Sequence, residues 1–226
     1  MSSQLPILLF LVPFVTAVAM PILCARRRSW CRPLTTGAVS LMVILAVTNL
    51  RFVLNEGSIK YALGGWTEPI GIAWLNDPLA AIVALTMSGV ALLSLIYGRA
   101  IVMPALDKSV QYYTLVLLFI SSLVGIVFAA DLFNVFVFLE VAALTGYALV
   151  GAAGGKALVH AFRYLLLGSF GATLYLLGVS YLYAATGTLN MADLAPRIPE
   201  LITSMAVVGG LIFIFLGLSI KMALIS

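Results

Sequence analysis

Apolar runs of about twenty residues recur along the whole chain of 226 residues. A helix rises about 1.5 Å per residue, so runs of this length match the hydrocarbon core of a bilayer. With 63% hydrophobic and only 9% charged residues, the chain has too little polar surface for a soluble domain. The sequence therefore predicts an all-α polytopic membrane protein of about seven helices. They are expected near Leu5–Cys24, Pro33–Leu54, Pro78–Tyr97, Tyr112–Ala130, Leu132–Gly151, Ala157–Tyr183 and from Leu201 to the chain end.

The segment between the second and third expected helices has a different period. Every second residue is apolar or aromatic in two short runs, which are Ile59, Tyr61 and Leu63, then Ile70, Ile72 and Trp74. Glycines and Pro69 stand between the runs, so a small β-hairpin is predicted near residues 56–77. Trp66 and Trp74 are expected at the level of the lipid headgroups. Asp77 and Asp131 are expected to cap the helices that follow them.

Basic residues predict the orientation. With the N-terminus outside, the inner loops hold seven of them: Arg26, Arg27, Arg28, Arg32, Arg99, Lys108 and Lys156. The outer loops hold Lys60 and Arg197, with Arg51 near an outer helix end. This bias places the N-terminus and the hairpin outside, in a multi-pass protein of the cell (inner) membrane. The net charge of +4 then reflects orientation, and no nucleic-acid partner is expected.

Glu140 is an ionisable residue near the middle of the fifth expected helix. An ionised carboxylate there costs about 2.5–3.5 kcal/mol on insertion scales. Burial disfavours the charged form and a nearby cation favours it, so such a pair can gain and lose a proton. The alternative is a permanently protonated Glu140 that hydrogen-bonds a neighbouring helix.

Arg163 and His160 lie toward the inner end of the sixth expected helix. The axial gap between Arg163 and Glu140 is about 9 Å by helix geometry. A relay role for Arg163 competes with structural pairing and with snorkelling to the headgroups. His160 has the side-chain type that titrates near neutrality, but a single histidine there equally fits an interfacial residue.

Lys221 follows the start of the last apolar run by about twenty residues, which is about 30 Å on a continuous helix. That length predicts an interfacial lysine. Lys221 reaches the membrane centre only if the helix is interrupted or starts further out. Gly209, Gly210 and Gly217 permit either a break or close helix packing.

Ligands for a cofactor or a metal are not recognisable in the sequence. The two cysteines, Cys24 and Cys31, predict neither a disulfide framework nor a metal site. No phosphate loop, dinucleotide fingerprint, nucleophile triad, haem or iron–sulfur ligand set is present. The chain is therefore expected to have no catalytic site of its own and no cofactor.

Three segments carry a family resemblance: "ADLFNVFVFLEVAALTGYALVG", "AFRYLLLGSFGATLYLLGVSYLYAATGTLNMADLA" and "LGLSIKMAL". They resemble the antiporter-like membrane subunits of respiratory complex I, membrane-bound hydrogenases and Mrp-type cation/proton antiporters, with the D subunit of the Mrp type the nearest in character. "GGWTEPIGIAWLNDPLAAI" is similar to the hairpin and third helix of this family.

The resemblance implies roles for several residues. Glu140 corresponds to the family glutamate, and Lys221 to a family lysine in a discontinuous helix, which would put it at mid-depth. The two would act as a charge switch that changes affinity along a polar channel. Relatives usually have lysine at the position of Arg163, and an arginine keeps its charge, so it would only tune the pair.

The resemblance also implies an organisation and partners. Residues 1–111 would form three helices with the hairpin, and residues 112–226 an incomplete first antiporter-like repeat, as in a split subunit, a truncated product or a fragment. The chain is expected to translocate protons, or to exchange protons for Na+ or K+, within a multisubunit complex in the lipid bilayer. The alternative is a non-conducting structural or assembly subunit, or a truncated remnant.

Overall fold

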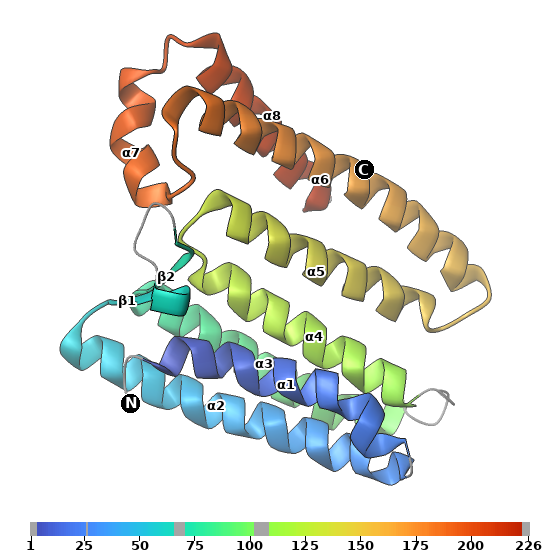
Figure 1. The fold of residues 1–226 in the computed structure, drawn as a ribbon. Coiled ribbons are helices and arrows are strands. Elements are labelled where there is room, and N and C mark those ends of the chain that lie inside the picture. The colour runs from blue at the N-terminus through green and yellow to red at the C-terminus, as the bar shows by residue number, and fades with distance from the viewer. Residues whose placement is uncertain (1–3, 26, 66–70, 102–108, 223–226) are drawn as a thin grey trace.

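The computed structural model describes residues 4–25, 27–65, 71–101 and 109–222. Seven of its α-helices lie side by side along one direction, while a short helix and a two-stranded hairpin lie together at one end (Figure 1). We call this the hairpin end and the opposite end the basic end. The helices are α1 (Leu5–Cys24), α2 (Cys31–Glu56), α3 (Pro78–Ile101), α4 (Ser109–Phe128), α5 (Leu132–Gly151), α6 (Lys156–Thr186), α7 (Met191–Glu200) and α8 (Met205–Lys221).

The helices confirm the predicted membrane architecture. Six of them are long and apolar enough to cross a bilayer, and α8 is a shorter apolar helix of 17 residues. The bounds of α1 and α5 agree with the prediction, and the other helices differ by a few residues at their ends. Helix α7 was not expected from the sequence, and Pro196 and Pro199 lie inside it.

Side-chain caps explain where two helices begin. The backbone N–H of Ala80 donates to Asp77 Oδ1 at 2.7 Å, and that of Asn134 donates to Asp131 Oδ1 at 2.7 Å. Each bond satisfies a backbone donor that the first turn of a helix leaves free. Burial raises the pKa of the Asp131 carboxyl, while hydrogen bonds from the backbone of Asn134 and Phe133 oppose that rise.

The predicted hairpin is present, with β1 (Ile59–Ala62) and β2 (Ala73–Asn76) antiparallel and Ile59 opposite Asn76. It is shorter than the alternation indicated, since Leu63 begins a 3₁₀ turn and Ile72 precedes the strand, although the Leu63 N–H still donates to the Ile72 carbonyl at 2.9 Å. Trp66, Pro69 and Ile70 lie outside the described residues.

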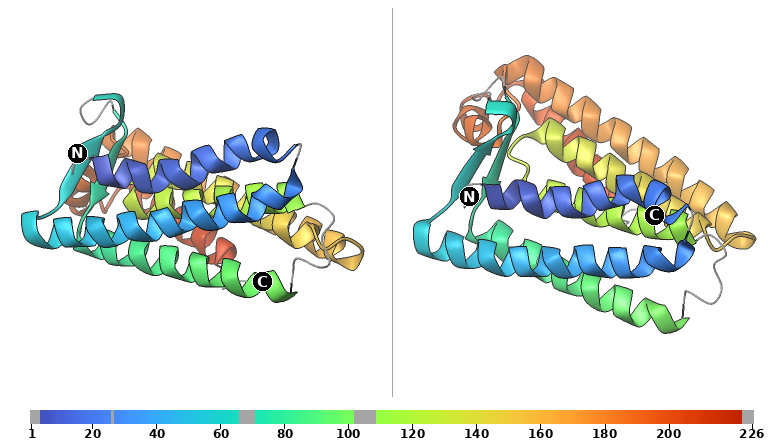
Figure 2. Two further views of the ribbon diagram at one scale, coloured as in Figure 1. Left: turned by 90° about the horizontal axis from the view of Figure 1, so that it is seen from below. Right: turned by 60° about the horizontal axis from the view of Figure 1, so that its bottom comes forward.

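The hairpin is hydrogen-bonded to the turn between α4 and α5. The Ala130 N–H donates to the Ala73 carbonyl at 3.2 Å, and the Met191 N–H donates to the Ala130 carbonyl at 3.0 Å. Asp131 also forms a bridge with Asn190 just before α7. Strand β2, this turn and the start of α7 are therefore linked by backbone hydrogen bonds (Figure 2).

Trp74 corrects one expectation. Its side chain is 1% exposed and lies among aromatic rings, with ring centroids 5.5 Å from Phe10, 6.1 Å from Phe128 and 6.0 Å from Phe138. It belongs to the core shared by α1, α2, α3 and α4 instead of facing the lipid headgroups. Alternation alone could not show that one side of the hairpin faces the helix bundle.

The remaining helices continue from this core in chain order. Helix α4 packs on α5, α5 on α6, and α6 on α8. The division into residues 1–111 and 112–226 stays a prediction.

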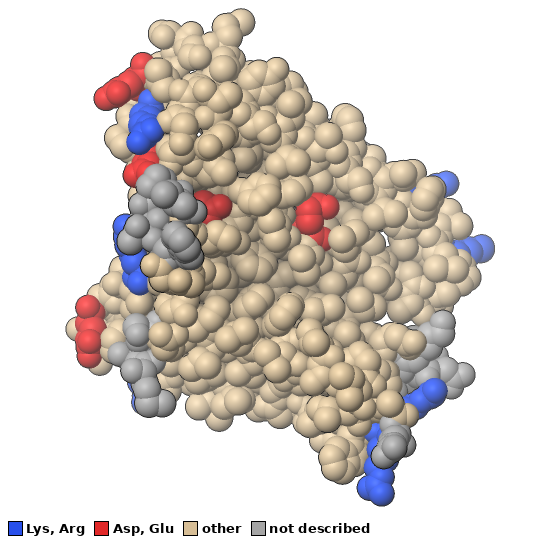
Figure 3. All heavy atoms as spheres, in the orientation of Figure 1, with Lys and Arg blue, Asp and Glu red and all other residues tan. Residues whose placement is uncertain are grey.

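The two ends of the molecule differ in charge (Figure 3). Among the described residues, every acidic side chain except Glu140 lies at the hairpin end, beside three basic ones: Glu56, Asp77, Asp131, Asp193 and Glu200, with Arg51, Lys60 and Arg197. The α1–α2 and α5–α6 turns at the basic end contain arginines and Lys156. Arg26 and Lys108 lie outside the described residues, and the orientation in the membrane stays a prediction.

Candidate functional site

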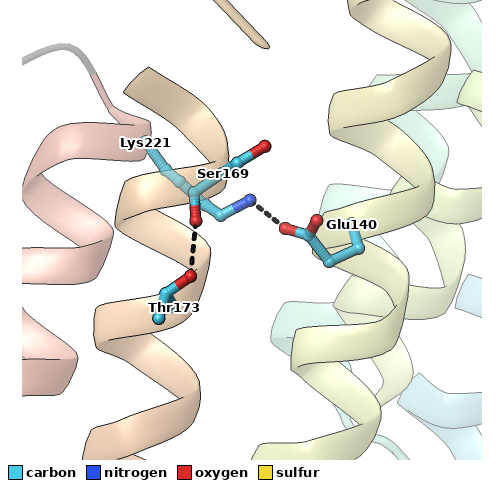
Figure 4. A network of polar contacts seen from close by, with 4 residues as sticks. All are labelled: Glu140, Ser169, Thr173 and Lys221. Atoms are coloured by element: carbon cyan, nitrogen blue, oxygen red, sulfur yellow. Dashed lines mark hydrogen bonds and ion pairs between the residues drawn. The ribbon is translucent and has the colours of Figure 1, made fainter. Parts of the chain in front are cut away.

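Glu140 and Lys221 form an ion pair between α5 and α8 (Figure 4). The Lys221 ammonium donates a hydrogen bond to Glu140 Oε1. The Lys221 side chain is 8% exposed and that of Glu140 is 27% exposed. The structure thus brings together two of the four residues that the sequence singled out, although 81 positions separate them along the chain.

The pair lies at the mid-depth of the bundle. Glu140 has eight residues before it and eleven after it in α5. Contacts between α5 and α6 join Phe136 to Tyr175 and Tyr147 to Gly168. This antiparallel register puts Glu140 opposite about residue 171, and Gly171 is the middle residue of α6.

The register of α8 on α6 explains how Lys221 reaches that depth. Gly210 contacts Gly178, and Gly217 contacts Gly171, so the end of α8 lies beside the middle of α6. Helix α8 begins at Met205, four residues later than expected, and packs along the half of the 31-residue α6 nearer the hairpin end. Lys221 therefore lies beside the middle of α6 and not at a helix-bundle end, which differs from the interfacial position expected from a helix of about twenty residues.

Glycines let α6 and α8 approach closely. A Cβ atom at Gly178 would lie 2.5 Å from the Gly210 carbonyl oxygen, and one at Gly217 would lie 2.6 Å from that of Gly171. Side chains at these positions would force the two backbones apart. Of the two outcomes considered for the α8 glycines, close packing is observed, and α8 is continuous from Met205 to Lys221.

Arg163 and His160 are not part of the pair. Both side chains are exposed on α6, and among the described residues neither has a hydrogen bond or ion pair with Glu140 or Lys221. Eight residues separate Arg163 from Gly171, so it lies about 12 Å nearer the basic end than Glu140, compared with the 9 Å expected from sequence.

Tyr147 is a neighbour that the sequence did not single out. It follows Glu140 by seven residues, which places both on one face of α5. Its side chain is 8% exposed, its hydroxyl lies against Gly168, and its ring meets that of Tyr164 edge-on at 4.6 Å. Tyr147 lies within electrostatic range of Glu140. The spacing of seven residues was the signal that could have found it.

Polar groups of α6 lie beside the pair. The Thr173 hydroxyl donates to the Ser169 carbonyl at 2.9 Å, and both residues flank the Lys221 ammonium in Figure 4. Ser169 and Thr173 are exposed, so this side of the pair is polar and open. No group of three or more His, Cys, Asp or Glu side chains able to hold a metal occurs among the described residues.

The charges of Glu140 and Lys221 stabilise each other at this site. A carboxylate and an ammonium removed from water stabilise each other, and removing one leaves a costly unpaired charge.

Comparisons with known proteins agree with this fold. A family model described as "NADH:quinone oxidoreductase/Mrp antiporter, TM" matches residues 129–226, a range that contains both Glu140 and Lys221. NADH-quinone oxidoreductase subunit N of Desulforudis audaxviator is 38% identical over 226 residues, covering 99% of this chain and 45% of the relative. The D subunit of the Na(+)/H(+) antiporter of Bacillus subtilis is 31% identical over 195 residues, covering 86% of this chain and 39% of the relative.

A solved structure is similar over nearly the whole chain. In the membrane-bound sulfane sulfur reductase, described as an archaeal respiratory membrane complex, one chain superimposes with a TM-score of 0.89 at 32% identity, covering 96% of this chain and 44% of that chain. The chain thus spans less than half the length of these relatives. The order of its motifs, its fold and these matches show that the chain belongs to the family of antiporter-like membrane subunits of NADH:quinone oxidoreductases and Mrp antiporters.

Proposed function

We propose that the chain translocates protons, or exchanges protons for a monovalent cation, as a subunit or half-subunit of a multisubunit complex in the inner cell membrane. The observation that carries this proposal is the contact between the Lys221 ammonium and Glu140 Oε1 at mid-depth of the bundle. The names of the relatives, a quinone oxidoreductase subunit and a Na(+)/H(+) antiporter subunit, support a role in ion translocation.

The pair acts as a charge switch. With Glu140 ionised, its carboxylate holds the Lys221 ammonium. When a proton binds to Glu140, the carboxyl becomes neutral and the ammonium loses its partner. Lys221 then either turns to another acceptor or gives up a proton, because an unpaired charge in a low-dielectric site is unstable. Loss of the proton from Glu140 restores the ion pair.

Arg163 and His160 would act between the pair and the basic end. Arg163 keeps its charge and can only change the electrostatic potential along α6. His160 lies one turn nearer the basic end than Arg163 and would bind water or a partner group there. Both side chains are exposed, which leaves them accessible to a partner subunit or to water.

The test is Glu140→Gln in the assembled complex, measured as ΔpH-coupled transport in membrane vesicles. Glutamine keeps the shape and cannot be ionised, so transport should be lost. The matched control is Glu56→Gln, an exposed carboxylate at the hairpin end of α2, which should leave transport unchanged. Normal transport by Glu140→Gln would exclude the charge switch.

The non-conducting alternative predicts a different result. If the chain is a structural or assembly subunit, Glu140→Ala should change only the amount of complex, which a blue-native gel measures on the same membranes. Unchanged complex abundance with lost transport therefore supports translocation, whereas a parallel loss of both supports the structural role.

A further inference from the structure

Three sulfur atoms meet where α1 turns into α2 at the basic end. Cys24 is the last residue of α1, Cys31 is the first residue of α2, and Met20 precedes Cys24 by one helical turn. The Cys24 thiol donates to Met20 Sδ at 3.3 Å, and Cys31 lies within interaction range of the Cys24 side chain. All three side chains are 0% exposed. We call Met20, Cys24 and Cys31 the sulfur triad.

Local structure holds the triad in place. Positions 20 and 24 share one face of α1, because residues four apart lie one above the other on a helix. The 3₁₀ turn at Arg28–Trp30 directly precedes Cys31, the first residue of α2. The Thr35 hydroxyl donates to the Cys31 carbonyl at 2.8 Å within the first turn of α2.

We propose that the sulfur triad is a binding site for one Cu(I) ion, with the Cys24 and Cys31 thiolates as ligands and the Met20 thioether as a third. Thiolate and thioether sulfurs are soft ligands and select Cu(I) over harder cations. Binding replaces two S–H protons by one monovalent cation, so two protons leave and the site carries a net charge of −1.

Basic residues lie close to Cys31 in the sequence. Arg32 follows Cys31 directly and Arg28 precedes it by three positions, and both side chains are exposed. The N-terminal end of the 26-residue α2 adds the positive end of a helix dipole at Cys31. The helix dipole therefore favours a Cu(I) site with a net charge of −1 at this position.

A cavity leads to the triad. It has a volume of about 420 Å³, lies between the end of α1 and the start of α4, and is lined by Cys24, Arg28, Gln111 and Thr114 among others. The Thr114 hydroxyl oxygen is buried and has no hydrogen-bond partner among the described residues. A small ion carried by a chelator can reach Cys24 from the surface by this path.

The sequence did not predict this site. Two cysteines separated by six residues give too few ligands, and Met20 stands within an apolar helix where methionine is ordinary. Only the fold shows that its sulfur accepts a hydrogen bond from the Cys24 thiol. If the triad were simple core packing, the three side chains would fill space without binding an ion.

The experiment titrates the reduced full chain in detergent with Cu(I), supplied anaerobically as its bathocuproine complex. We expect one Cu(I) per chain, release of two protons per ion, and an X-ray absorption first shell of sulfur. Cys24→Ser and Cys31→Ser should lose the ion, and Met20→Leu should keep it with lower affinity. Met42→Leu, a buried methionine of α2 outside the triad, is the matched control and should bind as the parent does.

Two results would overturn the proposal. One is failure of the parent chain to take Cu(I) from bathocuproine. The other is retention of the ion by folded Cys24→Ser or Cys31→Ser, with folding checked by circular dichroism. If the serine variants do not fold, the X-ray absorption measurement on the parent chain decides. Fewer than two sulfur atoms in the first shell of the ion would contradict binding by the two cysteines.

Discussion

Glu140 and Lys221 illustrate what single residues reveal in a sequence like this. A carboxylate in the middle of an apolar run predicts a functional site because its burial needs a partner. Glu140 was found in this way. The depth of Lys221 could not be predicted in this way. Counting residues along α8 gives a depth only if the start of the helix relative to its neighbours is known. That position is set by the contacts between α6 and α8.

The coupling free energy between Glu140 and Lys221 can be measured by a double-mutant cycle. Lys221→Met leaves the Glu140 carboxylate buried without its cation, which should destabilise the chain by about 3–5 kcal/mol. The double variant Glu140→Gln, Lys221→Met has no unpaired charge and should be more stable than Lys221→Met alone. Thermal unfolding in detergent measures both. Lys156→Met, an exposed lysine at the basic end, is the control; additive effects of the two site substitutions would contradict a direct pair.

At the scale of elements, hydrophobic length and helix caps were sufficient for α1, α3 and α5, and alternation of apolar residues was sufficient for the hairpin. Helix α7 could not be predicted from length, because it is ten residues long and contains two prolines. A cap and a contact to the preceding helix hold it: the Asn190 side chain accepts from Ala192 N at 2.9 Å, and Arg197 donates to the Thr186 carbonyl at 2.6 Å. Trp74 was misplaced for the same reason, since its partners come from α1, α4 and α5.

The close approach of α6 and α8 gives a prediction about glycine. Gly217→Ala places a Cβ atom 2.6 Å from the Gly171 carbonyl oxygen, so the helices must separate. We expect a loss of about 1–3 kcal/mol in stability and reduced transport, because Lys221 follows on the same helix. Gly209→Ala is the control on α8, since no atom lies within 4 Å of its added Cβ. Thermal unfolding of the two variants compares them, and equal stability would contradict the packing argument.

The cap of α7 gives a second prediction at this scale. Asn190→Ala removes the acceptor for the Ala192 and Asp193 backbone N–H groups. The stability of the helix should fall by about 0.5–2 kcal/mol. Hydrogen exchange of the α7 amides should therefore be faster. Asn190→Asp keeps an acceptor oxygen and should exchange slowly. Equal exchange in the alanine and aspartate variants would show that tertiary contacts alone hold the helix.

At the scale of the whole molecule, charge is distributed by end. The described acidic residues other than Glu140 gather at the hairpin end, whereas arginines and Lys156 mark the opposite end. Counting basic residues in the sequence predicted an end rich in arginine and lysine, because loop charge is fixed by composition and needs no knowledge of packing. The gathering of acidic residues at the hairpin end was not predicted. The way the helices associate, in contrast, depends on glycines and aromatic residues whose partners are distant in the chain.

Orientation can be tested with introduced cysteines. Ser58→Cys at the hairpin end should react with a membrane-impermeant maleimide applied to intact cells, and Ala153→Cys in the α5–α6 turn should react only after the membrane is opened. Both parent residues are exposed, while the native Cys24 and Cys31 are fully buried and should not react. The reverse pattern of labelling would place the N-terminus inside.

The partial exposure of Glu140 has a consequence for how the chain is studied. More than a quarter of this side chain faces outward at mid-depth of the helix bundle, where the described residues do not cover it. Whatever molecule lies there, lipid tail, detergent or neighbouring protein, sets part of the local dielectric constant and hence the strength of the attraction between the two charges. The coupling energy measured in the isolated polypeptide and in the intact assembly is thus expected to differ.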